Sequence, residues 1–170
     1  MKKINIITLG CSKNTVDSEH LAAQLVAMDY KVVFDSDRTD ADVVVINTCG
    51  FIGDAKQESI DTILRAAQLK EAGKIDELFV VGCLSQRYAD ELRPELPEVD
   101  DFFGVNDWAG IVERLGAKYR EENETKRELS TPSHYAYLKI SEGCNWMCGY
   151  CAIPLIRGRH KSVAMVALVA

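Results

Sequence analysis

The sequence predicts an α/β fold in which a parallel sheet is covered by helices. Over about the first hundred residues, short apolar runs rich in β-branched residues alternate with stretches of helical periodicity, which is the pattern of such a sheet. The 170 residues are 47% hydrophobic and 27% charged, which excludes a disordered or collagen-like chain. No internal repeat is evident, although the cysteines fall into two sets of three.

The elements of this fold follow from the hydrophobic pattern. Strands are expected over Asn5–Leu9, Lys31–Phe34, Val43–Asn47, Leu78–Val81 and Asp101–Phe103. Helices are expected over Val16–Met28, with Leu21, Leu25 and Met28 on one face, and over Ala55–Leu69, with Ile60, Ile63, Leu64 and Ala67 on one face. Shorter helices are expected over Tyr88–Leu92, stopped near Pro94, and over Trp108–Leu115, ended by Gly116.

The composition changes after residue 116. Residues 117–133 are dense in charge of both signs and poor in β-branched or aromatic residues, which favours a solvated linker or a ragged helix end. A new strand is expected over Tyr135–Ile140, followed at once by the loop 141–151. The sequence therefore predicts a first domain over 1–116, a linker over 117–133 and the beginning of a second domain over 134–170.

The N-terminal apolar run is too short for a signal peptide, because Asn5 interrupts it and Cys11-Ser-Lys-Asn14 ends it. No stretch approaches the roughly 20 apolar residues of a membrane span. We therefore expect a cytoplasmic protein with no membrane partner. Its six cysteines should be reduced and available for metal binding or redox chemistry, with structural burial as the alternative for any single one. The net charge of −6 argues against a free-standing nucleic-acid binder.

Cys11, Cys49 and Cys83 each follow the carboxyl end of a predicted strand. In open parallel sheets, ligands bind at that end. With the common flavodoxin-like strand order 2-1-3-4-5, the three strands bearing these cysteines are neighbours spaced at about 4.8 Å. Chance burial explains one such cysteine, but three in equivalent positions indicate a metal site.

A flavin-phosphate loop after the first strand is the rival interpretation. Ser12, Asn14, Thr15 and Ser18 supply suitable polar groups at a helix N-terminus, but the glycine spacing of phosphate-binding loops is absent. Helix capping is the simpler role for these side chains.

Cys144, Cys148 and Cys151 lie within eight residues on a loop that also holds Gly143 and Gly149. Such spacing allows three thiols to surround one metal centre. A structural zinc site would need a fourth ligand, for which His160 is the nearest candidate. A 4Fe-4S cluster held by three thiolates instead leaves one iron open for a reacting ligand.

The run Cys144-Asn-Trp-Met-Cys148-Gly-Tyr150-Cys151 resembles the motif of the radical S-adenosylmethionine superfamily. The resemblance implies that the open iron binds S-adenosylmethionine and that an electron from the cluster cleaves it to a 5'-deoxyadenosyl radical. It also implies that Tyr150 lies on the adenine side of the cofactor, with ordinary packing as the alternative role for this side chain.

Together the two cysteine sets resemble the methylthiotransferases of that superfamily, over nearly the whole chain. The resemblance implies two 4Fe-4S clusters and S-adenosylmethionine as cofactors, with Cys11, Cys49 and Cys83 holding the auxiliary cluster. It further implies a methylthiotransferase domain followed by the truncated start of a radical-SAM partial barrel. A chain truncated in this way is expected to be incomplete as an enzyme.

Three runs resemble the branch that adds a methylthio group to the β-carbon of an aspartate in small-subunit ribosomal protein twelve. They are Thr8-Leu-Gly-Cys11-Ser-Lys-Asn14, Asn47-Thr-Cys49-Gly-Phe-Ile52 and Lys139-Ile-Ser-Glu-Gly-Cys144. The implied partners are that ribosomal protein and an electron donor such as a flavodoxin. The transfer-RNA adenosine branch is a less favoured alternative, and a non-catalytic flavin- or metal-binding electron-transfer module is the other.

Arg157, Arg159, His160 and Lys161 form a small basic cluster after the second cysteine loop. A solvated surface is the simpler interpretation, and contact with a substrate or cofactor carboxylate is the alternative. His20 and His134 have no cysteine at motif spacing and are expected to be structural.

Overall fold

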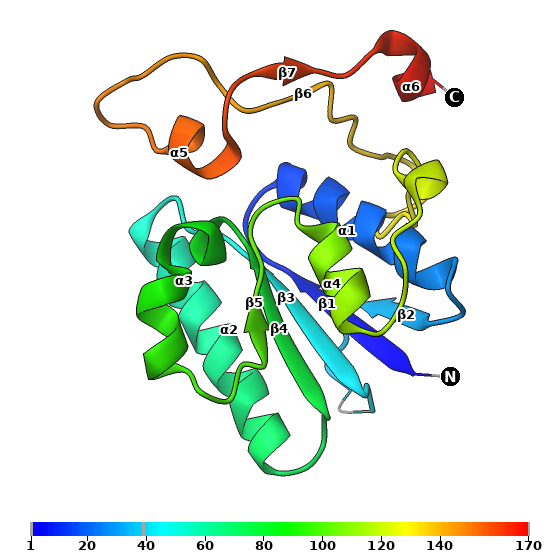
Figure 1. The fold of residues 1–170 in the computed structure, drawn as a ribbon, viewed down its shortest axis with the longest axis vertical. Helices are drawn as coiled ribbons and strands as arrows, with labels where there is room; N and C mark the ends of the chain where they lie inside the picture. The colour runs from blue at the N-terminus through cyan, green and yellow to red at the C-terminus, as the bar shows by residue number, and fades with distance from the viewer. Residues whose placement is uncertain (1, 39, 170) are drawn as a thin grey trace.

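The computed structural model describes residues 2–38 and 40–169. Its centre is a parallel five-stranded sheet in the order β2-β1-β3-β4-β5 (Figure 1). The strands are β1 (Lys3–Thr8), β2 (Lys31–Phe34), β3 (Val43–Thr48), β4 (Glu77–Gly82) and β5 (Asp101–Phe102). The predicted fold class, strand order and strand positions of this sheet are confirmed, with differences of one or two residues at the strand ends.

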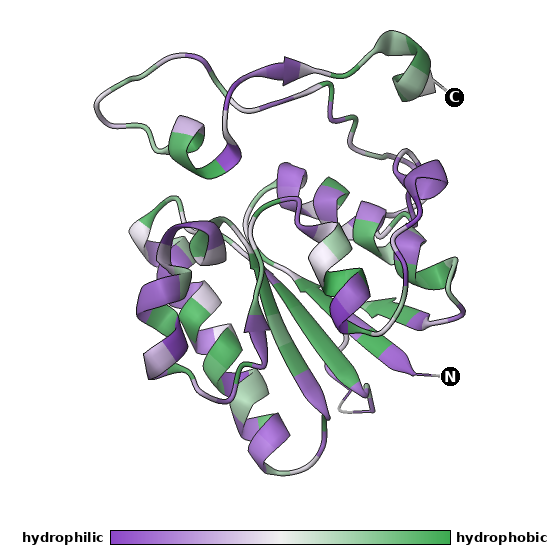
Figure 2. Ribbon diagram, in the orientation of Figure 1, coloured by the Kyte–Doolittle hydropathy of each residue, from purple (hydrophilic) through white to green (hydrophobic). Residues whose placement is uncertain are grey.

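Four helices cover this sheet: α1 (Ser12–Val26), α2 (Gly53–Glu71), α3 (Cys83–Glu95) and α4 (Trp108–Arg114). Helices α1 and α4 pack on one face, where Leu21 and Ile111 join a core with Phe79. Helices α2 and α3 pack on the other face through Ile63 and Leu84. The central strands are hydrophobic along most of their length in Figure 2, because both faces of the sheet are covered.

Three helix predictions require correction, the first because α1 spans Ser12–Val26 rather than Val16–Met28. Helix α3 begins at Cys83 rather than Tyr88, because Gly82 has a positive φ of 102° and turns the chain from β4 directly into the helix. Its first turn has little apolar periodicity, and only tertiary packing of Leu84 reveals it. On α2, we expected Leu64 to be on the buried face, but it is 44% exposed, and Ala66 is buried instead.

Residues 117–133 run along α1 after α4 ends. They include one 3-10 turn, η1 (Glu121–Asn123). The amide of Gln24 donates to the carbonyl of Arg120 at 2.8 Å and accepts from its backbone N–H at 3.2 Å. The ring of His20 meets the carbonyl of Lys126 at 2.9 Å, so this histidine has the structural role that we expected. The segment is largely exposed, yet it is attached to α1 along its length.

The expected strand over Tyr135–Ile140 is wrong. The last part of the chain instead contains β6 (Ser141–Glu142), α5 (Ile153–Arg157), β7 (Lys161–Ser162) and α6 (Met165–Val169), with β6 antiparallel to β7. Leu138 and Ile140 are 60% and 61% exposed, and no strand among the described residues pairs with this stretch. Alternation alone does not make a strand, because its backbone groups need a partner.

Among the described residues, no helix combines the length and the apolar character required to cross a bilayer.

Candidate metal centre

The first three cysteines converge at the carboxyl edge of the sheet, as the sequence predicted. Cys11 is the N-cap residue of α1, Cys49 directly follows β3, and Cys83 is the first residue of α3 after β4. Strand β3 pairs with both β1 and β4, so the three strand ends are neighbours. All three cysteines line one cavity of about 800 Å³.

Glycines beside these cysteines allow the chain segments to come close together. Gly10 has a φ of +93°, and a Cβ atom built on it would lie 2.6 Å from the Cβ of Cys49. A Cβ atom on Gly50 would lie 2.7 Å from the backbone nitrogen of Leu84. Neither site accepts a side chain without movement of the backbone, so these glycines are required for the convergence of the three cysteines.

The thiols differ in their exposure to solvent. Cys11 is exposed, Cys49 is half-buried and Cys83 is buried. Burial raises the pKa of the Cys83 thiol, and the neighbouring Cys49 and Cys11 raise it further, whereas the guanidinium of Arg157 acts in the opposite direction. Because thiolates are the metal ligands, binding a cation here would release protons and remove this unfavourable burial of charge.

The residues at this edge have the donor chemistry of an iron-sulfur cluster site. Among the described histidine, cysteine, aspartate and glutamate side chains, no group of three or more is close enough to hold one metal ion. In a four-iron cluster, each thiolate binds a different iron, so the sulfur atoms stand further apart than the ligands of one ion. Three soft thiol donors around one cavity fit an iron-sulfur cluster in kind.

The second set of cysteines lies on the loop between β6 and α5. The N–H of Cys144 donates to the carbonyl of Gly158 at 3.0 Å, and that of Cys151 donates to the carbonyl of Cys148 at 3.0 Å. Cys148 is exposed, whereas Cys144 and Cys151 are half-buried. None of these three lines the cavity of the strand-end thiols. Among the described residues, this cavity therefore brings together the first set and does not include the second.

Tyr150 stands in solvent on this loop, with 92% of its surface exposed. Trp146 and Met147 beside it are also mostly exposed. The alternative role of Tyr150 in ordinary packing is therefore wrong for the described residues. An exposed aromatic side chain beside the cysteines remains available for stacking on a ligand.

The two cysteine sets are connected through α5. This short helix begins two residues after Cys151, and its Ile153, Ile156 and Arg157 form part of the wall around the strand-end thiols. The loop that carries the second set thus leads directly into a helix that lines the cavity of the first set.

Arg157 is the residue for which the predicted solvated role is wrong. Its side chain is only 2% exposed and forms ion pairs with Asp17 at 3.0 Å and Glu142 at 2.8 Å. These two partners and Cys83 raise the pKa of Arg157 against the opposing effect of burial. Arg159, His160 and Lys161 do remain exposed. The sequence shows that the cluster is basic but not that one member points inward.

The polar residues after β1 are used inside the protein rather than held open for a phosphate. Asn14 is buried and donates to the carbonyls of Leu9 at 2.8 Å and Thr48 at 3.1 Å. Ser18 is also buried and accepts from the amide of Asn47 at 3.0 Å. The expected capping role is wrong as well, since the N-cap residue is Cys11 and no side chain caps the helix. These contacts argue against the flavin-phosphate loop.

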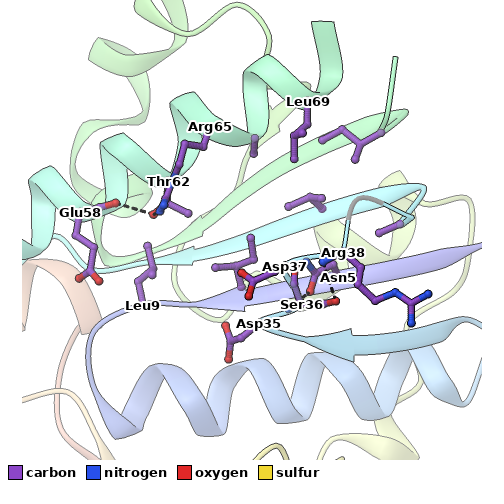
Figure 3. Close-up of a pocket in the computed structure, with 15 residues that line it drawn as sticks. Asn5, Leu9, Asp35, Ser36, Asp37, Arg38, Glu58, Thr62, Arg65 and Leu69 are labelled. Atoms are coloured by element: carbon purple, nitrogen blue, oxygen red, sulfur yellow. Dashed lines mark hydrogen bonds between the residues drawn. The ribbon is translucent and has the colours of Figure 1, made fainter. Parts of the chain in front are cut away.

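A second cavity, of about 340 Å³, opens on the α2 face of the sheet (Figure 3). It lies beside the connection from β2 to β3, whose described residues contain no helix. Asp35, Asp37 and Arg65 line it, and no cysteine does. It shares Leu9 and Glu58 with the cavity of the strand-end thiols.

Residues 3–104 match the model of the family described as "Uncharacterized protein family UPF0004". Curated relatives carry the name ribosomal protein uS12 methylthiotransferase RimO. The protein of this name from Bacteroides fragilis is 58% identical over 161 residues, which are 95% of this chain and 37% of the relative. Those from Phocaeicola vulgatus and Porphyromonas gingivalis are 57% and 52% identical, each over 98% of this chain and 38% of the relative. The chain thus spans somewhat more than a third of the length of these relatives.

Proposed function

Because the chain belongs to the family UPF0004, and its relatives are named as methylthiotransferases of a ribosomal protein, we propose that it is part of an enzyme with that activity. The proposed reaction adds a methylthio group to the β-carbon of an aspartate in ribosomal protein uS12. The observation that carries the proposal is the meeting of Cys11, Cys49 and Cys83 at one cavity whose wall includes α5. Such chemistry requires the cluster that supplies the sulfur to lie next to the cluster that generates the radical.

We assign the auxiliary cluster to Cys11, Cys49 and Cys83 and the radical-generating cluster to Cys144, Cys148 and Cys151. Bound there, the two 4Fe-4S clusters would supply the sulfur that accepts a methyl group and the electron that cleaves S-adenosylmethionine. Apolar side chains of Phe51, Ile52, Ile153 and Ile156 line the cavity. Tyr150 would stack on the adenine side of the cofactor.

The partners follow from this activity. The substrate is a ribosomal protein, and ribosomal proteins are basic, which the net charge of −6 complements. An electron donor such as a flavodoxin would reduce the clusters, and the reaction would take place in the cytoplasm, where ribosomes are.

Metal analysis tests the cofactor assignment. After anaerobic reconstitution with iron and sulfide, we expect about eight irons per chain and about four in each triple variant, Cys11→Ala/Cys49→Ala/Cys83→Ala or Cys144→Ala/Cys148→Ala/Cys151→Ala. Zinc without iron in the protein as isolated from cells, together with failure to reconstitute, would contradict the proposal.

Mass spectrometry tests the substrate. In cells that lack the gene, uS12 should lose the mass of one methylthio group, and an episomal copy of the gene should restore it. Loss of a methylthio group from a transfer RNA adenosine with uS12 unchanged would instead support the other branch.

A further inference from the structure

Arg157 joins the segment that carries the second cysteine set to helix α1. Its Nη2 donates to Oδ1 of Asn14 at 2.6 Å, and its Nη1 donates to Asp17 at 3.0 Å and to Glu142 at 2.8 Å. Asn14 and Asp17 lie on α1, whereas Glu142 lies in β6, directly before the cysteine loop. One buried guanidinium therefore contacts both parts of the chain.

The contact with Asn14 continues to the strand ends. Asn14 donates from its own amide to the carbonyls of Leu9 and Thr48, which precede Cys11 and Cys49 closely in the chain. Arg157 is thus one side chain away from two of the three cysteine-bearing turns. A fixed fork of donors is suited to holding such a geometry, because it leaves the guanidinium little freedom.

Arg157 also adds a positive charge to the cavity wall. It lines the cavity together with Cys83, Cys49 and Cys11. Lys139 belongs to the same ion-pair network, since it contacts Asp17 and pairs with Glu142 at 2.7 Å, but it does not line the cavity. Lys13 also lines the cavity and pairs with Glu142 at 3.2 Å, but its side chain is 39% exposed. Arg157 is the buried cation of this cavity wall. Charge close to an iron-sulfur cluster changes its reduction potential, and a buried charge is poorly screened.

We propose that Arg157 is a positioning residue that seats the loop of Cys144, Cys148 and Cys151 against the strand-end thiols and raises the reduction potential of the cluster held by those thiols. This inference rests on the proposed function, because it takes Cys11, Cys49 and Cys83 as cluster ligands. It adds the residue that couples the two sites and sets the redox property of one of them.

The test for charge uses the chain with Cys144, Cys148 and Cys151 changed to alanine, so that only the strand-end cluster is observed. In this background, the midpoint potential is measured by electron paramagnetic resonance during a redox titration. We expect Arg157→Gln to lower the potential and Arg157→Lys to keep it nearer the native value. Lys139→Gln, which removes a cation from the same network but not from the cavity wall, should cause the smaller shift.

Glu142→Gln is expected to shift the reduction potential in the opposite direction. It removes a carboxylate that pairs with Arg157, Lys13 and Lys139, so the potential should rise. This comparison keeps the inference testable if Arg157→Gln fails to fold. Equal potentials in Glu142→Gln and the native background, or equal shifts in Arg157→Gln and Lys139→Gln, would overturn the role of the charge.

Hydrogen exchange of the metal-free chain tests the seating without any cluster. We expect the amide of Cys144, which is bonded to Gly158, to exchange about tenfold faster in Arg157→Gln. Unchanged exchange there would overturn the seating role. If the native chain takes up no iron-sulfur cluster, both the proposed function and the effect of Arg157 on the potential are refuted. The positioning role of Arg157 is still tested by hydrogen exchange.

Discussion

Glu19 receives two hydrogen bonds from Ser130 on one carboxylate oxygen, from the backbone N–H at 2.8 Å and from the hydroxyl at 3.0 Å. Its other oxygen accepts from the guanidinium of Arg127, with Nε at 3.1 Å. Glu19 is fully buried on α1, although it is a charged residue. A buried carboxylate thus attaches residues 117–133 to the first part of the chain.

Removal of this carboxylate should destabilise the protein. In Glu19→Ala, Arg127 loses its carboxylate partner and Ser130 loses its acceptor, so we expect the free energy of unfolding to fall by about 3 kcal/mol. Urea denaturation followed by circular dichroism measures it. Glu128→Ala, at an exposed carboxylate in the same segment, should change the value by less than about 0.5 kcal/mol. Similar losses in both variants would contradict the role of Glu19.

Gly10→Ala should disturb the cavity of the strand-end thiols. The added methyl group meets Cys49 on a backbone with a φ of +93°, so we expect a loss of more than about 1 kcal/mol of stability. Iron bound after reconstitution should fall as well. Gly53→Ala is the matched control, because nothing lies within 4 Å of its added Cβ and its φ is not positive. Full iron content in Gly10→Ala would show that the close approach is unnecessary.

The Glu142 carboxylate should make the protein acid-sensitive. Burial alone would raise its pKa, but the hydrogen bond and charge of Lys139 and the charge of Arg157 lower it to about 2. Since the folded-state pKa lies below the ordinary value of 4.5, this stabilisation is complete above about pH 4.5 and is lost as the pH falls towards 2.

Urea denaturation at several pH values between 4.5 and 2 measures this dependence. The difference in unfolding free energy between the native protein and Glu142→Gln should shrink steadily over this range. Glu91→Gln, at an exposed carboxylate on α3, is the control and should parallel the native protein. A constant difference between native protein and Glu142→Gln would refute the ion-pair explanation.

Tyr150 should matter for ligand binding and not for folding. Because 92% of its surface is exposed, Tyr150→Ala should change the free energy of unfolding by less than about 0.5 kcal/mol. Affinity for S-adenosylmethionine, measured by calorimetry on the reconstituted protein, should be weaker in Tyr150→Ala and near native in Tyr150→Phe, which keeps the ring. Native affinity in Tyr150→Ala would argue against stacking.

The sheet and the strand-end cysteine site were predictable because their signals are local. The run Val43–Thr48 is buried along its whole length and begins with four apolar residues, as expected for a strand covered on both faces. Once the strand order is the common one, the positions of Cys11, Cys49 and Cys83 after their strands bring them together without further information.

The polar face of α1 was not predictable. Asn14, Asp17, Glu19 and Gln24 are buried on this helix, although polar residues on a helix usually indicate solvent or a cap. Each of them has a partner in the chain after residue 116: for example, Arg157 is 140 residues from Asp17, and Ser130 is 111 residues from Glu19.

The sequence by itself therefore determined the sheet and the meeting of Cys11, Cys49 and Cys83 at its edge, because hydrophobic periodicity and motif spacing lie within short stretches of chain. Only the tertiary structure decided that Arg157 points inward, that Tyr150 stands in solvent and that residues 117–133 lie against α1. A polar side chain is buried only when a partner satisfies it, and that partner can lie anywhere in the chain.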